Sequence, residues 1–130
     1  MGMISKLYKK HLDSKVEEYW QIYHFDMEPG HVSYNNEGDA FKHCYWQVEM
    51  ALFFGQKIAE WMGVKHEDNN PYNTPAEREM DLHNNAVGRK IAKTVKKTWL
   101  FWIFHNWEDK VADEIMRAMK AGLLITKPKE

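Results

Sequence analysis

The chain has little cysteine, almost no net charge and no long apolar run, and each shortage excludes a class of protein. Cys44 is its single cysteine, which excludes an intrachain disulfide and a cysteine-rich zinc site. The longest apolar run, at 99–104, is far shorter than the roughly 20 residues that a membrane-spanning helix needs. With 18 Lys and Arg against 19 Asp and Glu, the charge balance argues against nucleic-acid binding, which relies on a basic surface.

The remaining composition is typical of one globular domain. The 130 residues are 44% hydrophobic, contain only 4 prolines, and include six each of Trp, Tyr and Phe. The basic residues near the start are not followed by the apolar segment of a signal peptide. We therefore expect a cytoplasmic protein, or one delivered by a secretion route that uses no signal peptide.

The spacing of apolar residues predicts a compact all-α domain of four to five helices. The expected helices are 4–23, 39–62 with Gly63 as its stop, 75–97 and 106–120, with a polar loop at 66–73. Thr74, Pro75 and Glu77 form a helix start signal, with Thr74 as the N-cap. Segment 98–104 is compatible with a helix extension, a buried turn or a short strand. We expect 1–37 to form a helix and loop that pack on a domain of 38–125.

The first of three polar clusters lies at the start of the second predicted helix. Asp39 and His43 are four residues apart and therefore share a helix face, with Trp46 one turn further on. A carboxylate in that position can fix the tautomer of an imidazole, or both groups can bind one metal ion. The alternative interpretation is that Asp39 is only the N-cap and His43 an ordinary surface or half-buried histidine.

The second cluster, His66 and Glu67, follows the predicted end of that helix. These two side chains are a candidate metal-ligand or acid/base pair directed back towards His43. The alternative is a solvated acidic loop, because Asp and Asn residues follow directly at 68–70.

In the third cluster Asn84 and Asn85 lie three and four residues after Asp81, so that Asp81, Asn85 and either Gly88 or Arg89 line one stripe of a helix. Adjacent asparagines are unfavourable inside a helix because their side chains compete for backbone hydrogen bonds. A ligand or a buried hydrogen-bond network should compensate for them, and Gly88 is also compatible with close helix packing.

Other polar residues lack such a pattern. We expect His83 to be exposed, Cys44 to be a buried small residue rather than a nucleophile, and Lys93 to belong to a solvated face.

Together the clusters resemble a poorly characterised bacterial domain family. Its pattern is Asp-Ala-x-Arg-His-x-x-Trp, then His-Glu, then Met-Asp-x-x-Asn-Asn-x-x-Gly-Arg, and the likeness extends over about 38–125. Such domains often end long secreted or Rhs-type polymorphic toxins, so the resemblance implies a bacterial or phage toxin or effector module with a host or immunity protein as partner. Lys42 replaces the usual Arg, which exchanges a two-pronged anion contact for a point charge.

The leading hypothesis is a small helical hydrolase that acts on an ester, phosphodiester or glycosidic bond in a small-molecule, lipid or cell-wall substrate. Its expected catalytic residues are His43, Asp39, Glu67 and Asp81; its metal ligands are His43, His66 and Asp81; its substrate-binding residues are Trp46, Asn84, Asn85 and Arg89. The candidate cofactor is one Zn²⁺, Mn²⁺, Mg²⁺ or Ca²⁺ ion.

Two alternatives remain open beside a weaker third, nucleic-acid binding through the lysines at 90–97, against which the balanced charge argues. A metal-free hydrolase would use His43 as a base oriented by Asp39 or Asp81. A non-enzymatic binding protein would instead use the same Asp, His and Asn side chains as a buried network that specifies helix packing.

Overall fold

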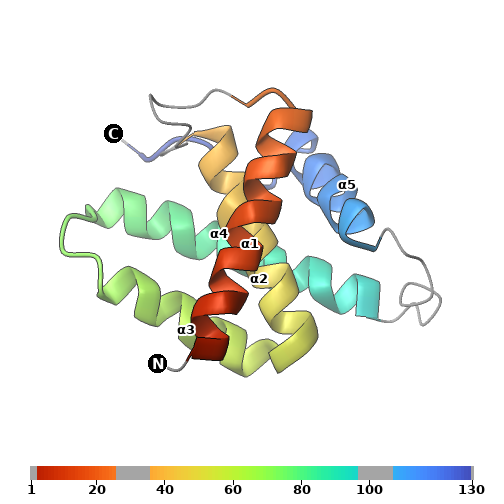
Figure 1. The fold of residues 1–130 in the computed structure, drawn as a ribbon. Coiled ribbons are helices and arrows are strands. Elements are labelled where there is room, and N and C mark those ends of the chain that lie inside the picture. The colour runs from red at the N-terminus through yellow and green to blue at the C-terminus, as the bar shows by residue number, and fades with distance from the viewer. Residues whose placement is uncertain (1–2, 26–35, 97–106, 130) are drawn as a thin grey trace.

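A computed structural model describes residues 3–25, 36–96 and 107–129. These ranges contain helices α1 (Met3–Ile22), α2 (Glu37–Phe54), α3 (Gln56–Asp68), α4 (Pro75–Lys96) and α5 (Trp107–Lys120), and no β-strand (Figure 1). The predicted all-α class with four to five helices is therefore confirmed, whereas the prediction for 98–104 lies outside the described residues. None of the helices in these ranges is both long enough and apolar enough to cross a bilayer.

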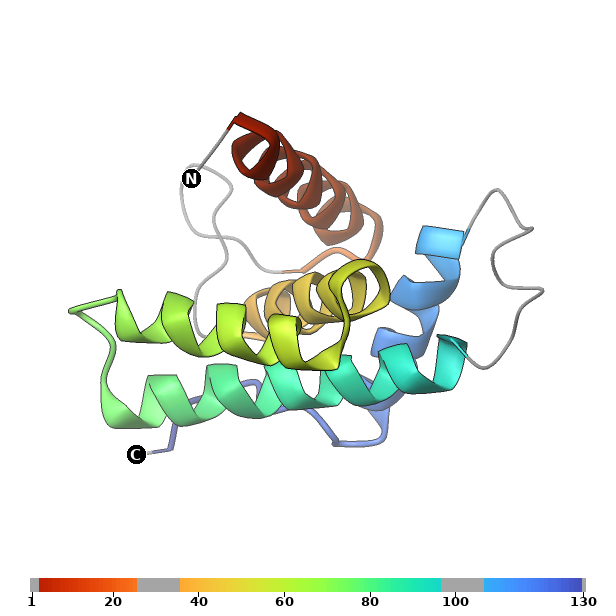
Figure 2. The same ribbon diagram turned by 90° about the horizontal axis from the view of Figure 1, so that it is seen from below.

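Helix α2 is the centre of the arrangement. It lies between α1 on one side and α4 on the other, while α3 and α4 run antiparallel side by side (Figure 2). Apolar side chains from all five helices meet around it, and the largest of them are Leu12, Val16, Tyr19, Trp20, Phe41, Tyr45, Val48, Leu52, Met80, Val95, Val111 and Ile115. Because α2 is covered on both sides, 12 of its 18 residues are buried, including the acidic Asp39 and Glu49.

The prediction of one helix over 39–62 is wrong, because the chain breaks into two helices at Gly55. Gly55 has φ +94°, a conformation that favours glycine, and its N–H still bonds to the Ala51 carbonyl 3.0 Å away. Gly63, predicted as the stop, lies inside α3. A Cβ on it would come within 2.8 Å of Asn85 Nδ2, so this glycine permits close packing against α4 rather than ending a helix.

The start signal of α4 is confirmed. The Glu77 N–H donates to Thr74 Oγ1 at 3.2 Å, and the Thr74 N–H donates to Glu77 Oε1 at 3.3 Å. α4 then runs to Lys96, close to the predicted end. α5 ends at Lys120, and Gly122 follows with φ +75° as expected for a glycine just past a helix end.

Helices α2 and α4 approach so closely at Gly88 that no side chain fits there. A Cβ at this position would overlap the backbone carbonyl oxygen of Cys44 and lie 2.9 Å from Gln47 Cβ. The alternative that Gly88 serves close helix packing is thus confirmed. This contact fixes the two helices against each other and sets which side chains of α2 face α4.

Candidate functional site

Two helices contribute a buried cluster of three potential ligands. Asp39 lies in the first turn of α2, His43 follows one turn later, and Asp81 comes from the second turn of α4. Their exposed fractions are 2%, 5% and 6%, and one ligand atom from each lies within 4.8 Å of the other two. Asn36, not Asp39, caps α2, since its side chain accepts the Asp39 N–H at 3.1 Å. The capping interpretation of Asp39 is therefore wrong.

The centre of this cluster is His43 Nε2, which lies 3.4 Å from Asp39 Oδ1 and 3.4 Å from Asp81 Oδ1. One ring nitrogen carries at most one hydrogen and cannot donate well to two carboxylates. Asp81 Oδ1 is buried and accepts no hydrogen bond from the part of the chain described. Two ligands of a tetrahedral ion with bonds of about 2.05 Å stand about 3.3 Å apart. The spacing therefore fits a shared cation better than a hydrogen bond.

Glu67 adds a third carboxyl beside Asp81. It lies in the last turn of α3 and is only 3% exposed, so neither the predicted loop position nor the solvated-loop alternative holds for it. Asn73 Nδ2 donates to Glu67 Oε1 at 2.5 Å, and Glu67 and Asp81 share a hydrogen bond. Asp68, the next residue, is exposed and pairs with Arg78 on the surface.

Negative groups outnumber positive ones in this cluster. Lys42 Nζ lies 3.2 Å from Asp39 Oδ1 and 5.3 Å from the centre of the Trp46 ring, and is the nearest permanent positive charge described. Burial, the hydrogen bond with Glu67 and the charges of Glu67 and Asp39 raise the pKa of Asp81 to about 9, although Lys42 lowers it. Without a cation, Asp81 is therefore protonated at neutral pH.

The rings of His66 and Trp46 lie beside the His43 ring. The exposed His66 ring lies 6.1 Å from the His43 ring and 5.8 Å from the half-buried Trp46 ring. Burial of its covered face lowers the pKa of His66 more than the neighbouring Glu67 raises it. Trp46 Nε1 is buried and donates to no described residue. A neutral imidazole and a buried N–H donor are thus available beside the three ligands.

The other predicted site residues make contacts elsewhere. Asn84 Nδ2 donates to the Ile125 carbonyl, and Asn84 Oδ1 accepts the Ile125 N–H, both at 2.8 Å. Asn85 packs against Gly63 of α3, and Arg89 Nη1 donates to Gln47 Oε1 at 2.9 Å. These contacts hold helices and the C-terminal segment together, and a role of the three side chains in substrate binding stays a prediction.

Residues outside the three clusters also support the site or lie buried near it, and the sequence around them gave little indication of this. Asn73 supports Glu67 from a loop that carried no pattern of its own. Gln47 and Glu49 are buried at 2% and 1% exposure on either side of Val48. A polar residue within the apolar stripe of a helix is a signal that could have identified both. Cys44 is buried, as predicted, and burial raises its pKa, which argues against a nucleophile.

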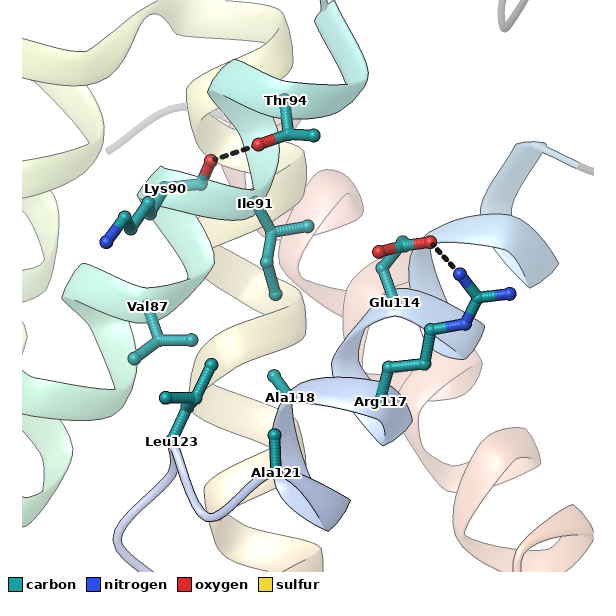
Figure 3. Close-up of a pocket in the computed structure, with 9 residues that line it drawn as sticks. All are labelled: Val87, Lys90, Ile91, Thr94, Glu114, Arg117, Ala118, Ala121 and Leu123. Atoms are coloured by element: carbon teal, nitrogen blue, oxygen red, sulfur yellow. Dashed lines mark hydrogen bonds and ion pairs between the residues drawn. The ribbon is translucent and has the colours of Figure 1, made fainter.

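An open groove of about 350 Å³ separates α4 from α5 (Figure 3). Its walls carry the apolar side chains of Val87, Ile91, Ala118 and Leu123, with the Glu114–Arg117 ion pair at 3.3 Å on one edge. It contains none of the predicted site residues, so the polar cluster and not this groove is the candidate site.

Residues 17–123 match the family described as Domain of unknown function (DUF6973), and the chain therefore belongs to this family. The match begins within α1, further towards the N-terminus than the motifs at 38–125 had indicated. It agrees with the predicted membership of a poorly characterised domain family. No curated protein and no solved structure matches the chain.

Proposed function

We propose that this member of the family is a hydrolase whose active site is the Asp39–His43–Asp81 cluster, loaded with one divalent cation. The observation that carries the proposal is the position of His43 Nε2, 3.4 Å from an oxygen of each aspartate. A cation coordinated by these three atoms would replace the proton of Asp81 and bind an oxygen of each aspartate together with the imidazole nitrogen.

The donor set suits a borderline ion. One imidazole with two carboxylates is compatible with Zn²⁺ or Mn²⁺, whereas Mg²⁺ and Ca²⁺ prefer oxygen ligands alone. His66 stands on the solvent side of His43, and its lowered pKa keeps the ring neutral at neutral pH, as a metal ligand must be. We therefore assign His66 as the candidate fourth ligand.

When bound, such an ion lowers the pKa of a coordinated water and polarises the bond to be cleaved. Glu67 lies outside the three-ligand set and is hydrogen-bonded to Asp81, so it would be the candidate general base if the ion were bound. Asn73 holds the Glu67 carboxyl in place through Oε1. Trp46 Nε1 offers a donor to an oxygen of the substrate.

The charge at the rim favours one of the three predicted bond types. Lys42 Nζ lies 3.2 Å from Asp39, and its side chain is 23% exposed, so a cationic group faces both the cluster and solvent. A substrate that carries a negative charge next to its scissile bond would be drawn to this position. Among ester, phosphodiester and glycosidic bonds, we therefore favour the phosphodiester.

The first experiment measures metal content and activity together. Wild type, His43→Ala and Asp81→Asn are purified without chelator or His tag, and bound metal is measured by mass spectrometry. Hydrolysis of bis(p-nitrophenyl) phosphate, p-nitrophenyl acetate and a p-nitrophenyl glycoside is then followed with added Zn²⁺, Mn²⁺, Mg²⁺ or Ca²⁺. Glu79→Gln is the matched control, because Glu79 lies on the same helix as Asp81 but is exposed and pairs with Lys129 at 3.5 Å.

We expect metal and phosphodiesterase activity in wild type and control, and loss of both in the two site variants. Activity without metal that depends on His43 would favour the metal-free mechanism. A wild type that neither binds metal nor cleaves any of the substrates would overturn the proposal.

The second candidate is a binding protein in which the cluster is a structural network. The observation that favours it is the chain of contacts Asn73–Glu67–Asp81, which joins α3 to α4. In that case Asp81→Asn or Glu67→Gln would change the free energy of unfolding by about 1–3 kcal/mol and have no effect on any activity or on toxicity upon expression.

A further inference from the structure

A second group of potential ligands lies where α1, α2 and α5 meet, on the opposite side of α2 from α4. His11 of α1, Glu49 of α2 and Glu108 of α5 each place one ligand atom within 4.8 Å of the other two. Figure 1 shows α1 lying across α2, with α5 on one side of them. His11 Nε2 lies 3.4 Å from Glu108 Oε2, the same separation as between the ligands of the first cluster.

Two polar atoms buried in this region have no hydrogen bond among the described residues. They are Glu49 Oε2 and Tyr8 Oη, and Glu49 is only 1% exposed. A buried carboxylate oxygen that accepts nothing costs free energy unless an ion or water satisfies it. This observation is independent of the ligand spacing and points to a bound species between the helices.

Glu108 has neighbouring polar groups that Glu49 Oε2 lacks. Tyr45 Oη donates to Glu108 Oε2 at 3.1 Å, and Lys15 Nζ lies 3.7 Å from Glu108 Oε1. Lys15 also lies 3.5 Å from Glu18, so it can remain paired if it moves away from Glu108. Lys15 is thus shared between Glu108 and Glu18, and Glu49 has no lysine or arginine partner among the described residues.

We infer that His11, Glu49 and Glu108 form a second divalent-cation site, which fastens α1 to α2 and α5. Because the ligand set is one imidazole and two carboxylates, the site is suited to Zn²⁺ or a similar transition metal rather than to Mg²⁺ or Ca²⁺. The His11 side chain is 50% exposed, which gives the ion a route from solvent. The bound ion has a structural role, because it joins three helices and lies on the other side of α2 from the Asp39–His43–Asp81 cluster.

His11 lies outside the residues that match the family, which begin at 17. The site is therefore expected to be a property of this chain and of relatives that carry a histidine at the same place in α1. It does not depend on the proposed hydrolase activity.

The experiment titrates the chelator-treated full chain with Zn²⁺ in a calorimeter and follows the thermal midpoint at saturating Zn²⁺. The variants are His11→Ala, Glu49→Gln and Lys15→Gln, with Glu17→Gln as an exposed acid-to-amide control on the same helix. Asp81→Asn is included so that the two clusters are separated.

We expect His11→Ala and Glu49→Gln each to weaken one Zn²⁺ site by at least about tenfold and to abolish the rise in midpoint that this ion produces. Lys15→Gln should tighten the same site severalfold, because it removes an opposing charge. Glu17→Gln should behave as wild type, and this site should persist in Asp81→Asn.

Zn²⁺ binding that is unchanged in His11→Ala and Glu49→Gln would overturn the inference. So would the absence of Zn²⁺ binding in Asp81→Asn, since all binding would then belong to the first cluster. If wild type binds one ion, lost in His11→Ala and kept in Asp81→Asn, the second site stands and the proposed active site fails.

Discussion

Replacing Asp81 with Asn should stabilise the cation-free protein, although the same change should abolish metal binding. The Asp81 carboxyl is 6% exposed, and burial, Glu67 and Asp39 raise its pKa from 3.8 to about 9. Folding at neutral pH must therefore add a proton to a group that is ionised in the unfolded chain. Asn has nearly the same shape and carries no charge, so the variant avoids this cost.

The size of the effect follows from the pKa difference. A group with a raised pKa in the folded state contributes its full stability below pH 3.8, and this is lost as the pH rises towards about 9. The upper limit of the loss is about 1.4 kcal/mol per pH unit, or about 2.7 kcal/mol between pH 5 and pH 7. The loss is smaller than this limit because the folded chain relaxes around the charged carboxyl and water reaches it. We therefore expect the difference in unfolding free energy between Asp81→Asn and wild type to grow by about 1–2 kcal/mol from pH 5 to pH 7.

The assay is urea unfolding with EDTA at pH 5, 6, 7 and 8 for wild type, Asp81→Asn and the control Glu79→Gln. Burial also raises the pKa of Glu49 to about 7 and lowers that of His66, but both effects cancel when two variants are compared at one pH. A difference between Asp81→Asn and wild type that stays constant with pH, or a less stable variant at pH 7, would refute the reasoning.

Three further substitutions test the Glu67–Asp81 contact, the close packing at Gly88 and the hydrogen bonds of Asn84. Glu67→Gln should lower the pKa of Asp81 from about 9 but not to 3.8, because burial is the largest cause of the raised pKa and remains in the variant. The pKa is measured by carbon NMR of the Asp81 carboxyl, and an unchanged value would contradict the contact with Glu67. Gly88→Ala should cost about 1–3 kcal/mol or more in urea unfolding, because a methyl group there overlaps the Cys44 carbonyl. A neutral result would show that α2 and α4 can move apart at this point without loss of stability. Asn84→Ala should cost about 1–3 kcal/mol, because it leaves both polar backbone groups of Ile125 without their partner, and unchanged thermal and urea midpoints would contradict that role.

The elements that could be predicted from sequence are those with local signals. The start of α4 was predicted correctly because Thr74 and Glu77 satisfy each other within one turn. The break at Gly55 was missed because it follows the apolar Leu52, Phe53 and Phe54, with no polar residue to mark a helix end. Gly63 was assigned as a stop because a glycine that permits helix contact has the same local signature as one that ends a helix.

The sequence could predict which site residues share a face of one helix, but not which helices bring their site residues together. The spacing of Asp39 and His43 places them on one face, but their meeting with Asp81 depends on the packing of α2 against α4, which no local pattern encodes. Asn84 and Arg89 share a helix with Asp81, yet their contacts are with Ile125 and Gln47. No local pattern connects His11 with Glu49 and Glu108, because these two side chains come from distant helices.

The pairing of Asn84 with Ile125 has a consequence for how the chain folds during synthesis. The two residues are 41 positions apart, and the amide of Asn84, fully buried in α4, is satisfied by the backbone of a segment that is in no helix. Until residue 125 has left the ribosome, α4 must keep this amide hydrated or unpaired. Docking of α4 in its final form should therefore be a late event in translation, and the nascent domain would remain accessible to proteases and chaperones until then.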